Sequence, residues 1–126
     1  MTNLPVVRRD PRDFLPIKDL ALRILIALAE GECHGWALMQ ELDEPGTRLL
    51  PGHLYRTLDR MLEDGLIAER DEPAARPAAA IGKRGTTPSR YFRLTPLGRD
   101  VARAETDRLE ALVARSRAGR LLRERR

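Results

Sequence analysis

Residues 51–65 read PGHLYRTLDRMLEDG and have the pattern of a single amphipathic helix. Proline is favoured at the first position of a helix and glycine just after the last, so Pro51 and Gly65 predict its two ends. At about 100° per residue, the apolar side chains of this stretch fall within about 100° of arc. They are Leu54, Leu58, Met61 and Leu62. We expect this side of the helix to be buried and the opposite side to be exposed.

Two further helices are predicted on the N-terminal side. Residues 18–29 are apolar on almost every side, which is typical of a helix packed centrally in a domain. Residues 34–42 form a shorter helix, which the Asp-Glu-Pro-Gly run at 43–46 brings to an end. We expect Trp36 to pack in the core with the other apolar residues of the shorter helix.

A β-hairpin and a fourth helix are predicted on the C-terminal side. Residues 66–70 and 90–94 have the length and composition of short strands, and the second of them alternates. Residues 71–89, between the strands, are rich in proline, alanine and glycine and predict a long, mobile loop. A Thr-Pro pair then suits the start of a helix that runs from residue 97 towards residue 122.

The predicted fold class is therefore mainly α with a small β-hairpin. Three helices followed by a basic hairpin is the order of a winged helix-turn-helix domain, which we assign to residues 15–95. Residues 1–14 show no periodicity and predict an extended N-terminal arm, with Phe14 and Leu15 docking on the core. Residues 96–126 are assigned to a C-terminal dimerisation helix and a basic tail.

The last helix is predicted to pair with a second copy of the chain. It is too long to be covered by so small a body, so its apolar stripe needs another partner. A homodimer supplies that partner most simply. The residues predicted at the dimer contact are Val101, Leu109, Leu112 and Val113.

Charge is strongly segregated along the chain, although the 126 residues carry only +4 in total. Residues 30–72 have a net charge of −7, whereas residues 73–99 hold six bases and no acid. The last twelve residues add +5. A polyanion such as nucleic acid is therefore a plausible partner, but only through particular patches. Each charge run also has the simpler interpretation of a solvated face.

Several short stretches together resemble one known family. They are LPIK at 15–18, AEG at 29–31, HGWAL at 34–38, PGHLYRTL at 51–58, LEDGLI at 62–67 and RYFRLTPLGR at 90–99. The combination resembles the PadR-like family of bacterial transcriptional regulators, and in particular its short members with one helix after the wing. The resemblance covers about residues 15–113.

The resemblance implies a function and an assembly. It implies a homodimer that is joined through the C-terminal helices and binds a pseudo-palindromic operator in double-stranded DNA, usually as a repressor. Two residues depart from the family pattern. His53 stands where a small hydroxyl residue is common, which affects the base preference, and Trp36 stands where tyrosine is usual, which we expect to change packing.

The amphipathic helix is the predicted reading element. A helix in the major groove reads the bases, and phosphate contacts fix its register. Glycine at the second position lets the backbone approach DNA closely, and the N–H groups of the helix start can bind a phosphate. The residues of this helix predicted to contact DNA are Gly52, His53, Tyr55, Arg56 and Arg60. Tyr55 is expected to donate a hydrogen bond to a phosphate, and the three basic side chains to reach bases or phosphates.

Basic residues outside this helix have alternative roles. Lys83 and Arg84 at the tip of the predicted loop suit a minor groove or its phosphates, although a disordered linker fits the same composition. Arg90 and Arg93 could bind phosphate or pair with the acidic first half of the chain. The arginine-rich tail at 115–126 could be a nucleic-acid arm, a solubilising end or part of the helix pair.

Other classes of protein find little support in the sequence. Cys33, His34 and His53 lack the spacing of a metal site, and no nucleophile elbow, catalytic triad or phosphate loop is visible. We therefore expect no enzymatic activity, no metal and no cofactor. No apolar run reaches membrane-spanning length and no export signal is apparent, so we expect no membrane association and a cytoplasmic location. The sequence gives no support for a small-molecule effector and no argument against one.

A protein-interaction adaptor is the alternative function. It would reuse the winged-helix body and bind a protein through the acidic segment at 30–72. DNA affinity would then be weak and indifferent to sequence.

Overall fold

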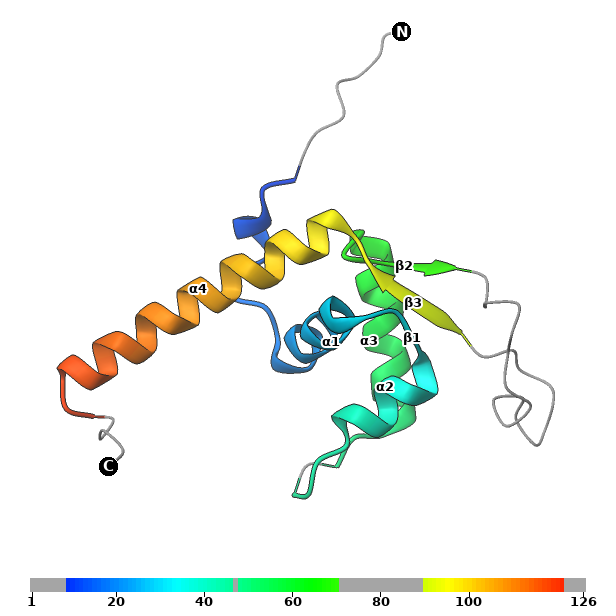
Figure 1. The fold of residues 1–126 in the computed structure, drawn as a ribbon, viewed down its shortest axis with the longest axis horizontal. Coiled ribbons are helices and arrows are strands. Elements are labelled where there is room, and N and C mark those ends of the chain that lie inside the picture. The colour runs from blue at the N-terminus through cyan, green and yellow to red at the C-terminus, as the bar shows by residue number, and fades with distance from the viewer. Residues whose placement is uncertain (1–8, 47, 71–89, 122–126) are drawn as a thin grey trace, which may run out of the picture.

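The computed structural model describes residues 9–46, 48–70 and 90–121. Within these ranges, helices pack together beside a small antiparallel sheet, which lies at one edge of the molecule (Figure 1). The helices are α1 (Asp19–Glu30), α2 (Gly35–Leu42), α3 (Pro51–Asp64) and α4 (Pro96–Ala118). The strands are β1 (Cys33–His34), β2 (Ile67–Arg70) and β3 (Tyr91–Leu94), and a short 3-10 helix, η1 (Pro11–Phe14), precedes α1. The predicted class, mainly α with a small hairpin, is confirmed.

The sheet has the order β1-β3-β2, with β3 in the middle. Strands β2 and β3 pair antiparallel, with Ile67 opposite Leu94 and Arg70 opposite Tyr91. This confirms the predicted hairpin, whose loop at 71–89 lies outside the described residues. Strand β1, which places His34 opposite Tyr91 on the other side of β3, was not predicted. Two residues are too few to show an alternating pattern.

The core lies where α1, α2 and α3 meet the sheet and the start of α4. Its fully buried side chains include Ile24, Leu25, Leu38, Leu54, Leu58, Phe92 and Val101. Burying a side chain of this size contributes about 1.5–3 kcal/mol to stability. The predicted apolar face of α3 is confirmed, since Leu54, Leu58 and Met61 are buried and Leu62 packs against the same cluster.

The end of α3 and the start of α4 are joined by hydrogen bonds. Gly65 has a left-handed backbone with a φ of 80°. Glycine adopts this conformation at little cost, and the Gly65 N–H donates to the Leu62 carbonyl at 3.1 Å. The Thr95 hydroxyl lies 2.6 Å from the Gly65 carbonyl oxygen and accepts from the Gly98 N–H at 3.0 Å. The C-terminal end of α3 is therefore held against the N-terminal end of α4.

Helix α4 is only partly covered by the body of the protein. Val101 and Glu105 on its first turns are buried, and the helix then continues away from the rest of the chain (Figure 1). The 3-10 helix η1 packs along α4, so residues 11–14 do not extend as the arm was predicted to do. Phe14 and Leu15 are partly buried against the core, as expected.

Trp36 is exposed, which corrects the expectation that it packs in the core. Its side chain retains 42% of its accessible surface. On α2 it comes two residues before the buried Leu38, a spacing that places the two side chains on nearly opposite sides of the helix. The indole therefore points away from the core, beside His34.

A buried carboxylate, not anticipated from the sequence, links α4 to the segment before α1. Glu105 is 2% exposed, accepts the Ile17 N–H at 3.3 Å and pairs with Arg108 at 2.6 Å. The hydrogen bond from Arg108 is the main reason that the pKa of Glu105 lies below its ordinary value of 4.5. The charged form is therefore the one that stabilises this junction.

The stability of the protein is expected to fall in acid through Glu105. Because the pKa is lowered on folding, the contribution is complete above about pH 4.5 and is lost as the pH drops through the folded-state value. Glu105→Gln should lower the free energy of unfolding by about 1–3 kcal/mol at pH 7. The melting temperature of this variant should also fall less steeply than that of the parent protein as the pH is lowered from 7 to 3. Glu110→Gln, at an exposed site on the same helix, is the control. An equally steep fall of the melting temperature in the parent protein and in Glu105→Gln would contradict this role.

Candidate nucleic-acid interface

The exposed face of α3 carries four of the five DNA-contacting residues that were predicted on this helix. They are Gly52, His53, Arg56 and Arg60, and all four are exposed. Pro51 occupies the first helical position, and the N-cap residue, Leu50, makes no capping hydrogen bond with its side chain. The Thr57 hydroxyl donates to the His53 carbonyl at 2.9 Å within the second turn. The basic side chains thus lie on one rigid helix, opposite the buried face.

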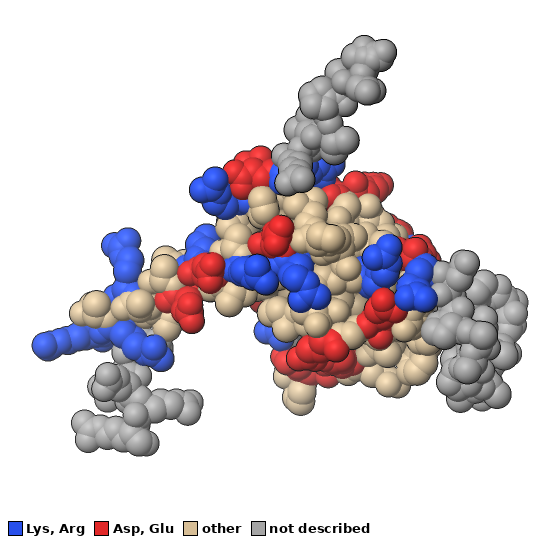
Figure 2. Space-filling model, turned by 45° about the horizontal axis from the view of Figure 1, so that its top comes forward, with Lys and Arg blue, Asp and Glu red and all other residues tan. Residues whose placement is uncertain are grey.

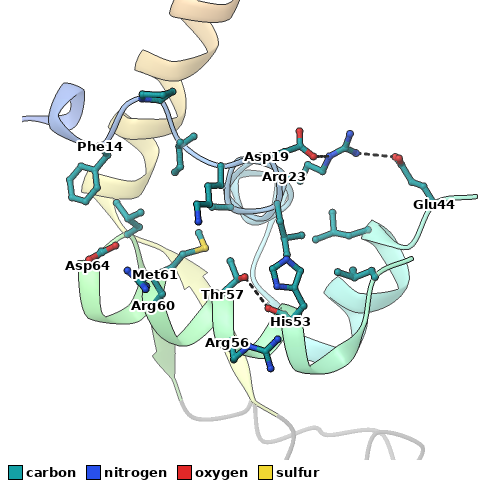
Figure 3. A pocket seen from close by; sticks show the side chains of 18 of the residues that line it. Phe14, Asp19, Arg23, Glu44, His53, Arg56, Thr57, Arg60, Met61 and Asp64 are labelled. Carbon is teal, nitrogen blue, oxygen red and sulfur yellow. Dashed lines mark hydrogen bonds and ion pairs between the residues drawn. The ribbon is translucent and has the colours of Figure 1, made fainter. Parts of the chain in front are cut away.

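A groove of about 820 Å³ lies beside this face, between α3 and the start of α1 (Figure 3). Apolar side chains such as Phe14, Ile17 and Met61 line part of it. The basic residues that line it are Lys18, Arg23, Arg48, His53, Arg56 and Arg60. Lys18 and Arg48 were not singled out by the sequence analysis, because neither belongs to a basic run. Their position in the groove shows that the cationic surface extends beyond α3.

Of the three acids that line the groove, Asp19, Glu44 and Asp64, the first two pair with one arginine. Arg23 pairs with Asp19 at 2.8 Å and with Glu44 at 3.2 Å, joining α1 to the segment between α2 and α3 (Figure 3). Within the described part of the chain, Arg56 and Arg60 form no ion pair. Their guanidinium groups are therefore available to a polyanion, whereas that of Arg23 is occupied.

Arg90 connects α3 to the base of the wing. It pairs with Asp59 of α3 and with Glu69 of β2, each at 2.8 Å, and lies 5.2 Å from the Phe92 ring centroid. The hydrogen bond to Glu69 is the main reason that the pKa of Arg90 is raised, and the same contact lowers the pKa of Glu69. Of the two roles left open for Arg90, the structure shows pairing with acids. Arg93 is exposed on β3 and pairs with no acid in the described ranges.

Tyr55 lies between α3 and α2 and is half-buried, unlike the four exposed residues of α3 that were also predicted to contact DNA. A Cβ atom at Gly35 would lie 2.5 Å from the Tyr55 hydroxyl, so only glycine leaves room for this contact. Burial is the main reason that the pKa of Tyr55 is raised. The predicted donation from Tyr55 to a phosphate therefore has to compete with its packing against α2.

The two predicted wing residues, Lys83 and Arg84, lie outside the described residues. Arg70 and Arg90 are the last described residues on either side of the loop. The described ends of β2 and β3 lie next to α3, because Arg90 pairs with Asp59 of α3 and with Glu69 of β2.

Three of the four predicted dimer residues are exposed on α4. Leu109, Leu112 and Val113 are 36%, 46% and 39% exposed, at helical spacings of three and four residues. Val101 is 0% exposed, because the first turns of α4 cover the core of the same chain. Val101 is therefore a core residue and not part of a dimer contact, which corrects the prediction. Figure 2 shows arginine side chains gathered at the far end of α4, where Arg115, Arg117 and Arg120 follow this apolar face.

Cys33 is half-buried, and burial raises the pKa of its thiol to about 11. A thiol of this kind is protonated at neutral pH and is a poor nucleophile and metal ligand. In residues 9–46, 48–70 and 90–121, no cluster of three or more acidic, histidine or cysteine side chains could hold a metal ion. No helix within the same ranges is long and apolar enough to span a membrane.

Comparison with known proteins agrees with this architecture. Residues 24–104 match the family described as the Transcriptional regulator PadR-like family. The chain is similar to Transcriptional regulator Rv3488 of Mycobacterium tuberculosis, with 36% identity over 92 residues that cover 73% of this chain and 77% of that protein.

Two solved structures show the same fold. One is a PadR family transcription regulator from Clostridium difficile R20291, with a TM-score of 0.64, 19% identity and coverage of 80% of this chain and 97% of that chain. The other is RosR of H. salinarum, with a TM-score of 0.57, 27% identity and coverage of 82% and 80%. Together with the match over residues 24–104, these similarities show that the chain belongs to the PadR-like family and is a DNA-binding transcriptional regulator.

Proposed function

We propose that the protein is a homodimeric repressor that binds a pseudo-palindromic operator, with α3 of each protomer in a major groove. The exposed face of α3 carries this proposal. Arg56 and Arg60 lie one turn apart on it, exposed and without an ion pair in the described part of the chain. One acid of the same helix, Asp59, is held by Arg90 and does not compete for them.

Each residue of this face has a role in the proposal. Arg56 and Arg60 contact guanine edges or phosphates, for which the planar guanidinium is well suited. His53 contacts a base edge, and Gly52 lets the backbone approach a phosphate at the start of the helix. Tyr55 contributes by holding α3 against α2, and its hydroxyl reaches a phosphate only if that packing loosens.

The wing completes the interface in this proposal. Lys83 and Arg84 contact the minor groove or its phosphates, at the end of the loop that leaves β2 and returns to β3. The support for these two residues is the basic, glycine-flanked composition of their stretch.

The dimer in this proposal is formed by α4. Leu109, Leu112 and Val113 contact the same residues of a second chain, and their exposure on a helix that leaves the body supports this. Residues 15–95 then form the DNA-binding unit and residues 96–126 the dimerisation unit. Repression is the action that the family resemblance implies, and the site of action is the cytoplasm, where the chromosome lies.

A gel-shift experiment with the DNA upstream of the chain's own gene tests the proposed function. We expect retardation that survives excess unrelated competitor DNA and weakens steeply between about 50 and 200 mM salt, because binding releases counterions from phosphates. Weak binding without sequence preference, together with a stable complex with another protein, would support the adaptor function instead.

A further inference from the structure

Trp36 has a large apolar side chain that lies on the surface, and the stability of the fold does not explain its exposure. Burial of an indole stabilises a protein. This one is nonetheless 42% exposed on the first turn of α2. Its position is well defined, because its ring stacks on the His34 ring with centroids 5.5 Å apart and planes 19° from parallel. The His34 ring in turn contacts the edge of Tyr91 at 4.8 Å.

This aromatic stack lies between the reading helix and the base of the wing. Gly35, next to Trp36, is in close contact with Tyr55 of α3. His34 pairs with Tyr91 of β3, and Tyr91 pairs on its other side with Arg70, where β2 ends. Trp36 is therefore flanked by the two elements that a winged-helix protein places against DNA.

The surroundings of the stack also suit a phosphate. Two of the carboxylates nearby, Glu69 and Glu32, are each held by an arginine, Glu69 by Arg90 and Glu32 by Arg70. The indole nitrogen carries one N–H that can only donate, and an anionic oxygen is its strongest acceptor. In helix-turn-helix proteins the helix that precedes the reading helix crosses the DNA backbone.

We infer that Trp36 is a backbone-contacting residue: its indole N–H donates to a phosphate between the groove read by α3 and the groove beside the wing. The inference rests on the proposed function and adds to it a neutral contact, supported from behind by His34 and Tyr91. Such a contact fixes the register of α3 without reading a base.

The chain has a single tryptophan, so the fluorescence of the unaltered protein reports on this residue directly. The probe is a labelled 30-base-pair duplex selected by the protein from a random pool, and its anisotropy measures binding independently. We expect the Trp36 emission to change, and quenching by acrylamide to fall at least about twofold, as the anisotropy saturates. Saturation of the anisotropy with unchanged emission and quenching would overturn the inference while leaving the proposed function intact. Failure of any duplex to bind would overturn both.

Variants separate a contact from a structural role. Trp36→Ala is expected to weaken binding by about tenfold, and Trp36→Phe, which keeps the ring and removes the N–H, by about three- to tenfold. The slope of log affinity against log salt should not change in either variant, because no charge is lost. Ile26→Ala removes a similarly exposed apolar side chain from α1 and should bind within about twofold of the parent protein. Parent-like affinity of Trp36→Phe, or an equal loss in Ile26→Ala, would overturn the inference.

Discussion

Replacing Arg56 and Arg60 together by alanine is expected to reduce operator affinity by at least about 100-fold. A bidentate arginine contact to guanine is worth about 1–3 kcal/mol, and each protomer loses two arginines. Both side chains are exposed and form no ion pair in the described ranges, so the fold should be unaffected. Anisotropy of a labelled operator duplex measures the affinity, and thermal unfolding checks the fold.

The chain offers a matched control for this pair. Arg99 and Arg103 are also exposed and also four residues apart, but they lie on α4. The double alanine variant at these positions removes the same charge and should lose affinity only a few-fold, through the general electrostatic term. Parent-like binding by the Arg56 and Arg60 variant, or an equal loss in the control, would show that α3 is not the reading helix.

Introducing aspartate at both Leu109 and Leu112 is expected to convert the proposed dimer into monomers. These side chains form the apolar face that α4 presents beyond the body, and charges buried in a contact between two identical helices repel each other. Light scattering should report a single chain. Operator affinity should fall by about 100-fold or more, because the two half-sites are then bound independently.

Two alanines on the opposite side of the same helix provide the control. Ala111 and Ala114 are exposed and have the same spacing as Leu109 and Leu112. Each alanine follows one of the leucines by two residues, so the two pairs lie on nearly opposite sides of α4. Aspartate at both alanines should leave a dimer. Persistent dimers in the leucine variant would place the contact elsewhere on the chain.

Helices and strands could be predicted from the sequence where residues at their own ends or within them mark their boundaries. Helix α3 begins at Pro51 and ends before Gly65 as expected, because proline and glycine act on the backbone of their own position. The hairpin was also predicted, since β3 alternates and buries Phe92. Strand β1 gave no such signal, because it forms only by pairing with β3, far along the chain.

The predicted burial or pairing of a side chain was wrong or left open where its contacts come from another helix or strand. Val101 and Leu112 are both apolar residues of one helix, and only the extent of the body decides that the first is core and the second is surface. The expectation that Trp36 packs in the core was wrong, because its angle around α2 places its side chain outside the core. The pairing of Arg90 with Asp59 and Glu69 joins three elements, which no local pattern specifies.

Methylation protection of guanine N7 in the operator tests the central claim most directly, because this atom lies in the major groove. A dimer with α3 of each protomer in a major groove should protect two clusters of guanines. Their centres should lie about 10–10.5 base pairs apart, or a multiple of that distance, and both should vanish with Arg56→Ala. A single cluster, or protection that is unchanged in Arg56→Ala, would contradict the account.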